Sequence, residues 1–539
     1  MDKRTGLAIA LCFLIYLGWQ KLYLEPRIPH TTETSAQQAP GTPEQVASAP
    51  QTPPANTAPP TLSKTTTQIA AAAPTVTRAE QTLPLKTSLA DVTIGNGSLF
   101  FQDWQLRDYH QGISTDTPEI NLRTAMNLSG AIEFAFDDTS YTYLASQRGE
   151  LKSTATGAIW SYEDANLKLT KEFFSQPGNP AVELKISGEF KTKKPSFAFV
   201  ALSSQLIEKD PEAQDRQMVY FTNKAIERVS VSESVSTKEI ATPVSYIGAT
   251  SRYFVMAVLA QQGTEPRALI QPAGPSTGRI SLVYPISANT FSIPVKVFFG
   301  PKDLSVLRAV DPLLDHTVDF GWFTVIAYPL LKILKFFYTL FKNYGVAIIL
   351  LTLLLKLVTY PLTYKSMKSM KEMASLQPQL AKLREKYKDD KETLNREMMT
   401  MMKSHGYNPM AGCLPILIQM PVFFALYRVL YSSMELYHSP FIFWIRDLSA
   451  HDPFYVTPVL LTVTMFIQQK LTPNTAADPM QAKMMQFMPL MFGAMMLALP
   501  SGLTLYMLVN ALASIGQQMM LNKKFNPPGN VQVLSARAK

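Results

Sequence analysis

A single lysine inside an apolar run is the residue most suited to do chemistry. Lys356 lies within the run 348–361, whose other side chains are mostly aliphatic. A charge in such a segment is costly in lipid unless water or a partner reaches it. Thr352 lies one helical turn away on the same face. Two interpretations follow: Lys356 carries its charge in a hydrated cavity, or its ammonium extends to the nearby cytoplasmic surface.

Polar residues recur in the apolar runs that follow. They are Gln419, Thr462, Thr464, Asn510, Ser514 and Gln517, and the last three have helical spacing. Together with Lys356 and Thr352 they are predicted to line a wet cavity that holds one positive charge. Arg428 is a further cation, seven residues before Glu435. The sequence leaves open whether Arg428 pairs with a carboxylate or reaches the outer interface.

The sequence does not indicate an enzyme. It contains no phosphate-binding glycine loop, zinc signature or nucleophile elbow. Ser501 lies between two apolar runs, but none of the six histidines lies inside a run, so an intramembrane serine protease has no evident base. Ser501 is instead predicted to break two helices. We expect no cofactor and no metal site.

Methionine is concentrated in the second half of the chain. Of the 25 methionines, 21 follow residue 360, with seven in 365–405 and seven in 480–496. Flexible, polarizable side chains suit a surface that accepts many apolar partners. In the apolar runs the same residues are equally well explained as helix packing.

Five apolar runs must position these groups, at about 344–362, 412–434, 455–469, 484–499 and 503–520. Several are shorter than the roughly 20 residues that cross a bilayer, so either the membrane is thin there or flanking residues contribute. Ten Lys and Arg residues lie between 365 and 403, whereas the loop 437–454 has only Arg446. The positive-inside rule then places both termini in the cytoplasm. The five runs form a helical membrane core over 344–522, followed by a basic cytoplasmic tail, 523–539.

Two further helical segments flank this core. Residues 319–342 combine an apolar face with Lys332, Lys335 and Lys342, which predicts an amphipathic helix on the outer membrane surface. The alternative is a first transmembrane span. Residues 365–405 have helical apolar spacing and predict a cytoplasmic helical hairpin. Pro378 is expected to start or kink its first arm.

The first half of the chain has three parts. Residues 1–25 predict an uncleaved membrane anchor, because a charged start and an apolar run are followed by no cleavage site. Residues 26–86 are rich in Pro, Ala and Thr and predict a disordered linker. Alternating apolar residues in 87–310 predict an all-β sandwich in the periplasm. The two cysteines, Cys12 and Cys413, provide no disulfide framework for it.

The net charge of +9 does not require nucleic acid as a partner. The basic residues lie beside apolar runs, where anionic lipid and the positive-inside rule account for them. DNA is therefore not expected to bind. Ribosomal RNA is the exception, because the basic tail and the hairpin both carry positive charge.

Several motifs follow one another in the second half of the chain. They are Asp319-Phe-Gly-Trp-Phe323, Tyr360-Pro-Leu-Thr363, Asn408-Pro-x-x-Gly-Cys-x-Pro415, Gln419-Met-Pro-x-Phe423, Trp444-Ile-x-Asp-Leu448, Asp478-Pro-Met-Gln481 and Pro500-Ser-Gly502. In order and spacing they resemble the YidC insertase family, in the long form of Gram-negative inner membranes. The anchor, linker and β domain match that family in layout.

The resemblance implies a membrane protein insertase and chaperone. Its five-helix core would enclose a hydrophilic groove that is open to cytoplasm and lipid and closed to the outside. The implied partners are nascent integral membrane proteins, the Sec translocon, the ribosome and membrane lipids. Where the family usually has a groove arginine this chain has Lys356, which keeps the charge and loses the planar guanidinium fork.

Other groove positions carry over one by one. Thr352, Met420 and Phe423 match groove-facing or substrate-contacting positions. A tyrosine often present in the last span falls at Met507, with Tyr506 beside it. The resemblance therefore adds Met420, Phe423, Tyr506 and Met507 to the site.

Two other classes of protein remain as alternatives. A transporter of a small solute or ion would use Lys356 and Arg428 as its site, but the five unequal runs show no internal repeat. A periplasmic binding module with a membrane anchor would place its activity in residues 87–310. Such a binding module would lose its activity without residues 87–310, whereas an insertase would keep much of its activity with residues 310–539 alone.

Overall fold

The computed structural model describes residues 78–525, apart from 98–99, 115, 129, 206–214, 224, 231–235, 275, 388–389, 405–413 and 473–478. The predicted anchor, most of the predicted linker and most of the basic tail lie outside the described residues. So do both cysteines, the start of the Asn408 motif and Asp478.

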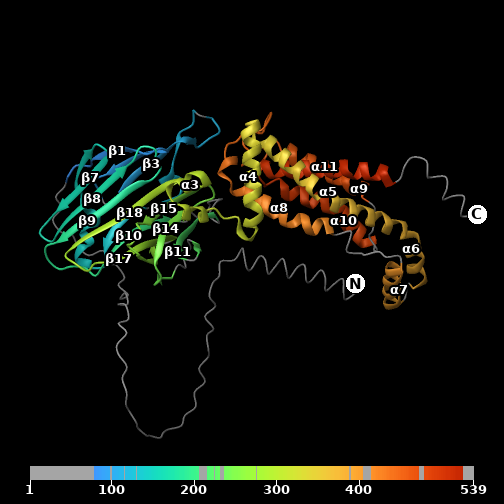
Figure 1. Cartoon of the computed structure of the whole chain (residues 1–539), viewed down its shortest axis with the longest axis horizontal. Helices are drawn as coiled ribbons and strands as arrows, with labels where there is room; N and C mark the ends of the chain where they lie inside the picture. Colours follow the sequence, from blue (N-terminus) through green and yellow to red (C-terminus); the bar gives the residue numbers. More distant parts are fainter. Residues whose placement is uncertain are drawn as a thin grey trace, which may run out of the picture. The chain divides into compact units, whose positions relative to one another are not determined.

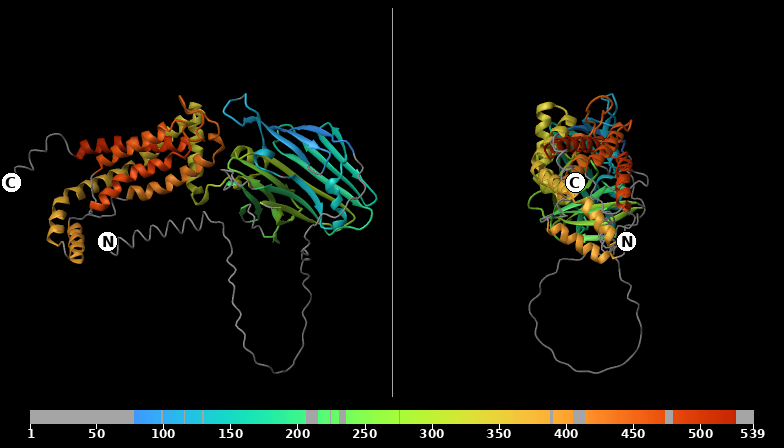
Figure 2. Two further views of the ribbon diagram at one scale, coloured as in Figure 1. Left: turned by 180° about the vertical axis from the view of Figure 1, so that it is seen from behind. Right: turned by 90° about the vertical axis from the view of Figure 1, so that its right-hand side faces the viewer.

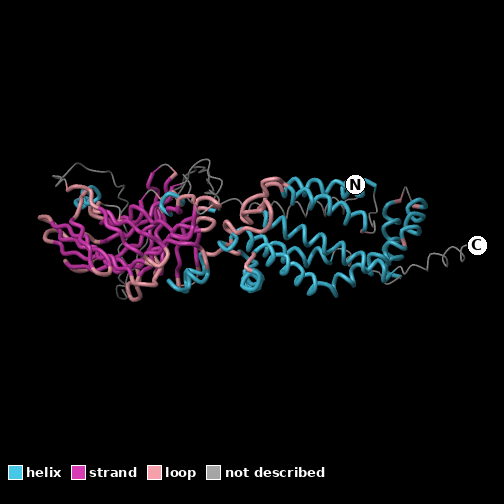
Figure 3. The backbone as a smooth tube through the Cα atoms, turned by 90° about the horizontal axis from the view of Figure 1, so that it is seen from above, coloured by secondary structure: helices cyan, strands magenta, loops and turns pink. Residues whose placement is uncertain are grey.

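Strands make up the first half of the described chain and helices the second (Figure 1 and Figure 3). All strand pairs are antiparallel. A four-stranded sheet has the order β1 (Thr82–Lys86), β2 (Ala90–Gly95), β3 (Phe101–His110) and β4 (Glu119–Asn121). A five-stranded sheet has the order β13 (Lys238–Ile240), β16 (Arg267–Gly274), β17 (Thr277–Pro285), β10 (Phe197–Gln205) and β5 (Gly130–Phe136).

The third sheet has nine strands. In order they are β12 (Ile226–Ser230), β11 (Gln217–Thr222), β14 (Val244–Thr250), β15 (Phe254–Ala260), β18 (Thr290–Pro301), β9 (Val182–Phe190), β8 (Leu167–Ser175), β7 (Gly157–Glu163) and β6 (Glu150–Thr154). Short helices α2 (Leu122–Ala125) and η1 (Thr139–Ser146) connect strands. The predicted alternation is present in β9, where Val182, Leu184 and Ile186 are buried and Lys185 is exposed.

One apolar core joins all three sheets. Trp104 from β3, Leu282 from β17 and Phe299 from β18 are fully or almost fully buried in it. The rings of Trp104 and Phe299 have centroids 4.4 Å apart. Because apolar burial is the main favourable term in folding, this shared core makes the sheets one domain.

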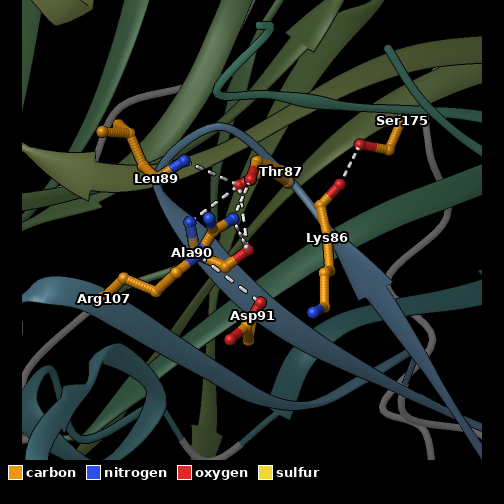
Figure 4. Close-up of polar contacts among 7 residues, drawn as sticks. All are labelled: Lys86, Thr87, Leu89, Ala90, Asp91, Arg107 and Ser175. Atoms are coloured by element: carbon orange, nitrogen blue, oxygen red, sulfur yellow. Dashed lines mark hydrogen bonds and ion pairs between the residues drawn. The ribbon is translucent and has the colours of Figure 1, made fainter. Parts of the chain in front are cut away.

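Strand β1 corrects the predicted linker, which extended to residue 86. Thr82–Lys86 pairs with β2, and the Ser175 hydroxyl donates to the Lys86 carbonyl at 2.5 Å (Figure 4). In the turn that follows, the Ala90 N–H donates to Thr87 Oγ1 at 3.0 Å, and the Arg107 guanidinium donates to the Thr87 carbonyl. Pro84 hides the strand in the sequence, because a proline cannot donate to a strand ladder and is tolerated only at an edge position such as that of β1.

A smaller apolar cluster covers the outer face of the nine-stranded sheet. After β18 the chain forms α3 (Leu304–Val310) and η3 (Pro312–Thr317). Leu307, Val310 and Leu314 pack there against residues of the sheet, including Phe298. Asp303 caps α3 by accepting from the N–H groups of Ser305 and Val306.

The second half is helical. Its elements are η4 (Gly321–Phe323), α4 (Thr324–Phe341), α5 (Tyr344–Ser375), α6 (Gln377–Lys386), α7 (Lys391–Ser404), α8 (Leu414–Ser432), η6 (Met434–Leu436), α9 (Val456–Leu471), α10 (Pro479–Met496) and α11 (Ser501–Phe525). Helix α11 packs against α5, α8 and α9, and α9 also packs against α10 (Figure 2). Each of the five apolar runs thus lies on a helix.

Helix α5 is longer than its predicted run. It continues through Pro361 to Ser375, so the predicted hairpin segment 365–405 does not start as a separate helix at 365. Lys, Met, Glu and Ala are good helix formers, which favours this continuation. Pro378 lies in the first turn of α6, as the sequence predicts, and α6 packs against α7.

Helix α4 has apolar side chains on more than one face. Leu330, Leu331 and Leu334 are buried, while Val325 and Phe336 are exposed. Lys335, one of the three lysines on the predicted polar side, is half-buried, and its Nζ lies 2.6 Å from Glu435 and 3.3 Å from Asp303. The carboxylates of Asp303 and Glu435, which come from distant segments, bind this lysine.

Candidate functional site

Lys356 lies on α5, facing α11. Its Nζ donates to Ser514 Oγ at 2.7 Å, and Ser514 in turn donates to the Asn510 carbonyl at 2.8 Å. Gln517 Nε2, one turn further along α11, donates to the Lys356 carbonyl at 3.3 Å. Within the described residues Lys356 forms no ion pair with a carboxylate. Among the described contacts its ammonium is therefore held by one neutral hydroxyl.

A second polar contact joins α8 to α11. Gln419 Nε2 donates to the Tyr506 hydroxyl at 2.9 Å. Tyr506 is almost fully buried in the apolar core of the helical region. Since Tyr506, Asn510 and Ser514 recur every four residues, they lie on one face of α11. The two contacts therefore share this face, and Tyr506 is the residue of the Tyr506–Met507 pair that bonds to Gln419.

The remaining predicted site residues lie at different depths. Thr352 is buried and donates to the Ile348 carbonyl of its own helix at 2.7 Å. Met420 is exposed on α8, whereas Phe423 and Met507 are partly buried against the core. Met420 is thus the accessible member of the predicted apolar contacts, and Phe423 and Met507 are half-accessible.

The polar residues of α9 do not join this group. Thr462 donates to the Pro458 carbonyl, and Thr464 donates to the Leu460 carbonyl. Both hydroxyls are therefore satisfied within their own helix. Their predicted place in the cavity finds no support among the described contacts.

Glu435 pairs with Lys335 of α4 rather than with Arg428. Lys335 Nζ also reaches Asp303, which belongs to the β domain's last turn before α3. Three distant segments are thereby joined at one point. The sequence concealed this cluster, since its members are separated by 32 and 100 residues along the chain.

A buried polar network joins the loop before α9 to the start of α11. Asp452 accepts from Trp444 Nε1 at 3.0 Å, and its second oxygen accepts from the Thr457 N–H and hydroxyl at 2.8 Å each. The Thr457 hydroxyl lies 3.1 Å from that of Thr504. Sequence analysis missed this network, although an acid a few residues before an apolar helix is a capping signal.

Ser501 belongs to the same junction. Its N–H and its hydroxyl both contact the Ala450 carbonyl, at 2.6 and 2.7 Å, and the Gly502 N–H donates to the Leu448 carbonyl at 2.8 Å. Helix α10 ends at Met496 and α11 begins at Ser501, as predicted for a helix break. These contacts tie together the loops that join α8 to α9 and α10 to α11.

Two helices of the described chain are long and apolar enough to cross a membrane. They are Gly321–Phe341 and Tyr344–Lys371. The first is the segment predicted to lie on the membrane surface, and its length and composition equally fit the alternative of a span. The two apolar helices and the partly buried cation of α5, together with the antiparallel β domain, are typical of one class: a membrane protein with a large domain outside the bilayer.

Comparison with known proteins agrees with this class. The family model described as "YidC periplasmic domain" matches residues 82–333, and "60Kd inner membrane protein" matches residues 336–528. Membrane protein insertase YidC of Pelobacter propionicus is 32% identical over 98% of this chain and 100% of that protein. Membrane protein insertase YidC of Geotalea daltonii is 47% identical, and the match spans 53% of this chain and about half (54%) of that protein.

A solved structure described as active YidC insertase with the first transmembrane domain resolved also matches. It is 19% identical, covers 82% of this chain and 93% of that chain, and has a TM-score of 0.37. The chain belongs to the YidC family of membrane protein insertases, by its likeness in sequence to a relative matched over its whole length. The β domain is accordingly the periplasmic domain of an inner-membrane protein.

Proposed function

We propose that this protein inserts nascent membrane proteins into the inner membrane through a hydrated groove between α5, α8 and α11. Lys356 supplies a positive charge that attracts acidic residues in the polar tail of the substrate. Met420 and Phe423 contact its apolar segment. The observation that carries the proposal is the Lys356 ammonium, held by the Ser514 hydroxyl and by no carboxylate within the described residues.

The energetics favour this role. A lysine at the centre of a membrane helix costs about 2.5–3.5 kcal/mol on insertion scales, so water near Lys356 would lower the cost of keeping it. The same water lowers the barrier for a polar tail. Release then follows from burial of the substrate's apolar span in lipid, at about 25 cal/mol per Å² of apolar surface. Nucleotide hydrolysis is not needed for such a step.

The topology that this mechanism needs is part of the proposal. The helices α5, α8, α9, α10 and α11 are the five core spans, and α4 lies at the outer surface. The helices α6 and α7 form the cytoplasmic hairpin, and both termini are cytoplasmic. The Sec translocon and the ribosome are proposed partners, the ribosome through the basic residues that begin with Lys523 and Lys524.

The test is complementation after depletion of the native protein. Insertion of a small substrate with an acidic tail is measured by protease protection. The wild-type chain and Lys356→Arg should restore insertion, since both carry the charge. Lys356→Ala should reduce it about tenfold, as expected for the loss of about 1.4 kcal/mol of attraction. Equal insertion by Lys356→Ala and wild type would overturn the role of the charge.

A further inference from the structure

Two phenylalanines stand out on the loop between α8 and α9. The Phe443 side chain is 80% exposed and that of Phe454 is 70% exposed. Leaving a phenylalanine in water forfeits about 1.5–3 kcal/mol relative to burial. Large apolar side chains exposed together on a fixed loop mark an interaction surface.

The loop is built to hold these side chains outward. Phe443 has φ 54°, and Tyr455, which directly follows Phe454, has φ 56°. Both values belong to the left-handed conformation that bulky residues rarely adopt. Asp452 fixes the loop, because it accepts from Trp444 Nε1 and from the Phe454 N–H, each at 3.0 Å. A short turn in which the Phe441 N–H donates to the Ile445 carbonyl at 2.9 Å surrounds Phe443. Such strain persists only where the surroundings enforce it.

The exposed surface continues onto α9. Val459, Val463 and Ile467 recur every four residues on this helix and are all exposed, whereas Leu461 and Thr464 face the bundle. One apolar stripe therefore runs along α9, and the exposed Phe454 precedes this helix by two residues. In a membrane protein such a stripe faces lipid, which brings the loop at the start of α9 to the membrane surface.

The length of α9 gives an independent reason. Its 16 residues rise about 24 Å, at 1.5 Å per residue. The hydrocarbon core of a bilayer is about 30 Å thick. About 6 Å of the hydrocarbon core is therefore left for the residues that flank α9.

Charge at the edge of the loop completes the argument. Arg446 is exposed and forms no ion pair within the described residues. Trp444 lies beside it, its ring stacked 6.0 Å from that of Phe443. Arginine and tryptophan at the end of an apolar surface are typical of the membrane–water interface, where guanidinium groups reach lipid phosphates.

We propose that the loop 441–455 is anchored in the outer leaflet of the membrane, with Phe443 and Phe454 among the acyl chains and Arg446 at the phosphate groups. The anchor extends the short helix α9 to the full thickness of the bilayer. The inference rests on the proposed function for one point, namely that α9 spans the membrane with this loop outside.

The test uses single cysteines labelled with bimane in the full chain, with Cys12 and Cys413 replaced by serine. Phe443→Cys and Phe454→Cys are reconstituted in vesicles of phosphatidylcholine and phosphatidylglycerol that contain acyl-brominated phosphatidylcholine. Ile113→Cys, on an exposed loop of the periplasmic domain, is the control for water. Val459→Cys is the control for lipid.

Quenching at 443 and 454 should be at least twofold greater than at 113 and should approach that at 459. Quenching no greater than at 113, with 459 still quenched, would overturn the anchor and leave the proposed topology intact. Absence of quenching at 459 would instead contradict the span itself. Disulfide-linked dimers of the unlabelled Phe443→Cys chain, together with no quenching of the labelled one, would overturn the anchor and show that a second copy covers the loop.

A second experiment tests the proposed contact of Arg446 with the lipid phosphate groups. Arg446→Glu places a negative charge against the lipid phosphates and should reduce quenching of the label at 443. The matched control is Arg446→Lys, which keeps the positive charge at the same position and should leave quenching as in the wild type. Unchanged quenching in Arg446→Glu would overturn the phosphate contact.

Discussion

The periplasmic domain and the helical region distribute their side chains in opposite ways. Among the described residues before Trp322, Ile113 is the only exposed large apolar side chain. In the helical region such side chains are numerous, and polar contacts such as Lys356–Ser514 lie between helices. The periplasmic domain is stabilised by the burial of apolar side chains away from water. The helical region is solvated by lipid, where apolar faces gain little free energy from packing against each other.

This difference in side-chain distribution predicts which substitutions destabilise each region. The periplasmic domain depends on close packing of its apolar core, so a cavity there should be costly. The helical region depends on a few polar contacts that fix loops and helix ends. Variants of both kinds test this contrast.

The largest effect is expected in the periplasmic core. Trp104→Ala should lower the free energy of unfolding of this domain by about 4 kcal/mol, because it leaves a large cavity. The measurement is limited proteolysis of the full chain over a temperature series. Gln105→Ala, the exposed neighbour on the same strand, should change little. The contrast would fail if Trp104→Ala left the protease-resistant domain as stable as in the wild type.

A somewhat smaller effect is expected at Asp452. Asp452→Ala leaves the Thr457 and Trp444 donors without an acceptor and should destabilise the helical region by about 3 kcal/mol. Thermal unfolding in detergent measures it, with Glu385→Ala, an exposed carboxylate on α6, as the control. Equal stability of the two variants would argue that the loop junction does not depend on the Asp452 carboxylate.

Asp452 also predicts a pH dependence. Burial raises the pKa of this carboxyl, but hydrogen bonds from Thr457, Phe454 and Trp444 outweigh it, so the folded-state pKa lies below its usual value. Its stabilisation is therefore present above pH about 4 and is lost as pH falls through the folded-state pKa. Asp452→Asn should show a weaker loss of stability in acid than the wild type. An identical acid profile would contradict this assignment.

Lys335 should have an intermediate effect. Lys335→Ala leaves Asp303 and Glu435 close together without their shared cation, which should cost about 2 kcal/mol. The value is set below that of a fully buried pair because Lys335 remains about one-third exposed. Thermal unfolding of Lys332→Ala, an exposed lysine on the same helix, gives the reference. A melting temperature equal to that reference would show that the cluster adds no stability.

The smallest effect is expected at Ser514, which positions Lys356. Ser514→Ala removes one hydrogen bond and should lower insertion about threefold, whereas Ser514→Thr keeps the hydroxyl and should restore it. Protease protection of the inserted substrate provides the readout. Leu512→Ala, exposed on the same helix, serves as the control. Equal loss in Ser514→Thr and Ser514→Ala would point to packing instead of the hydroxyl.

Local patterns predicted much of the architecture. Alternation marked strands such as β9 and β18, and apolar runs marked each of the helices α5, α8, α9, α10 and α11. What failed was non-local. Thr82–Lys86 becomes a strand only through pairing with β2, and the partners of Lys335 are Asp303 and Glu435, which lie 32 and 100 residues away in the sequence. Helix and strand periodicity relates only residues that are close in sequence, so it does not predict these partners.

The candidate site followed the same rule. Helical spacing predicted that Asn510 and Ser514 share a face, and the facing helix was predicted to carry Lys356. Local sequence patterns could not predict which residues bond to each other, because partners such as Gln419 and Tyr506 are 87 residues apart. The buried network around Asp452 was missed, since its members come from a loop and two helices.

The most direct test of the central claim, that Lys356 acts as a charge on the substrate, exchanges the two charges. Insertion is measured by protease protection for Lys356→Glu with two substrates, one with an acidic tail and one in which the tail acids are replaced by lysine. Lys356→Glu should insert the acidic-tail substrate at least tenfold less well than the wild type and should recover with the lysine-tail substrate. Equal insertion of both substrates by wild type and Lys356→Glu would contradict the account.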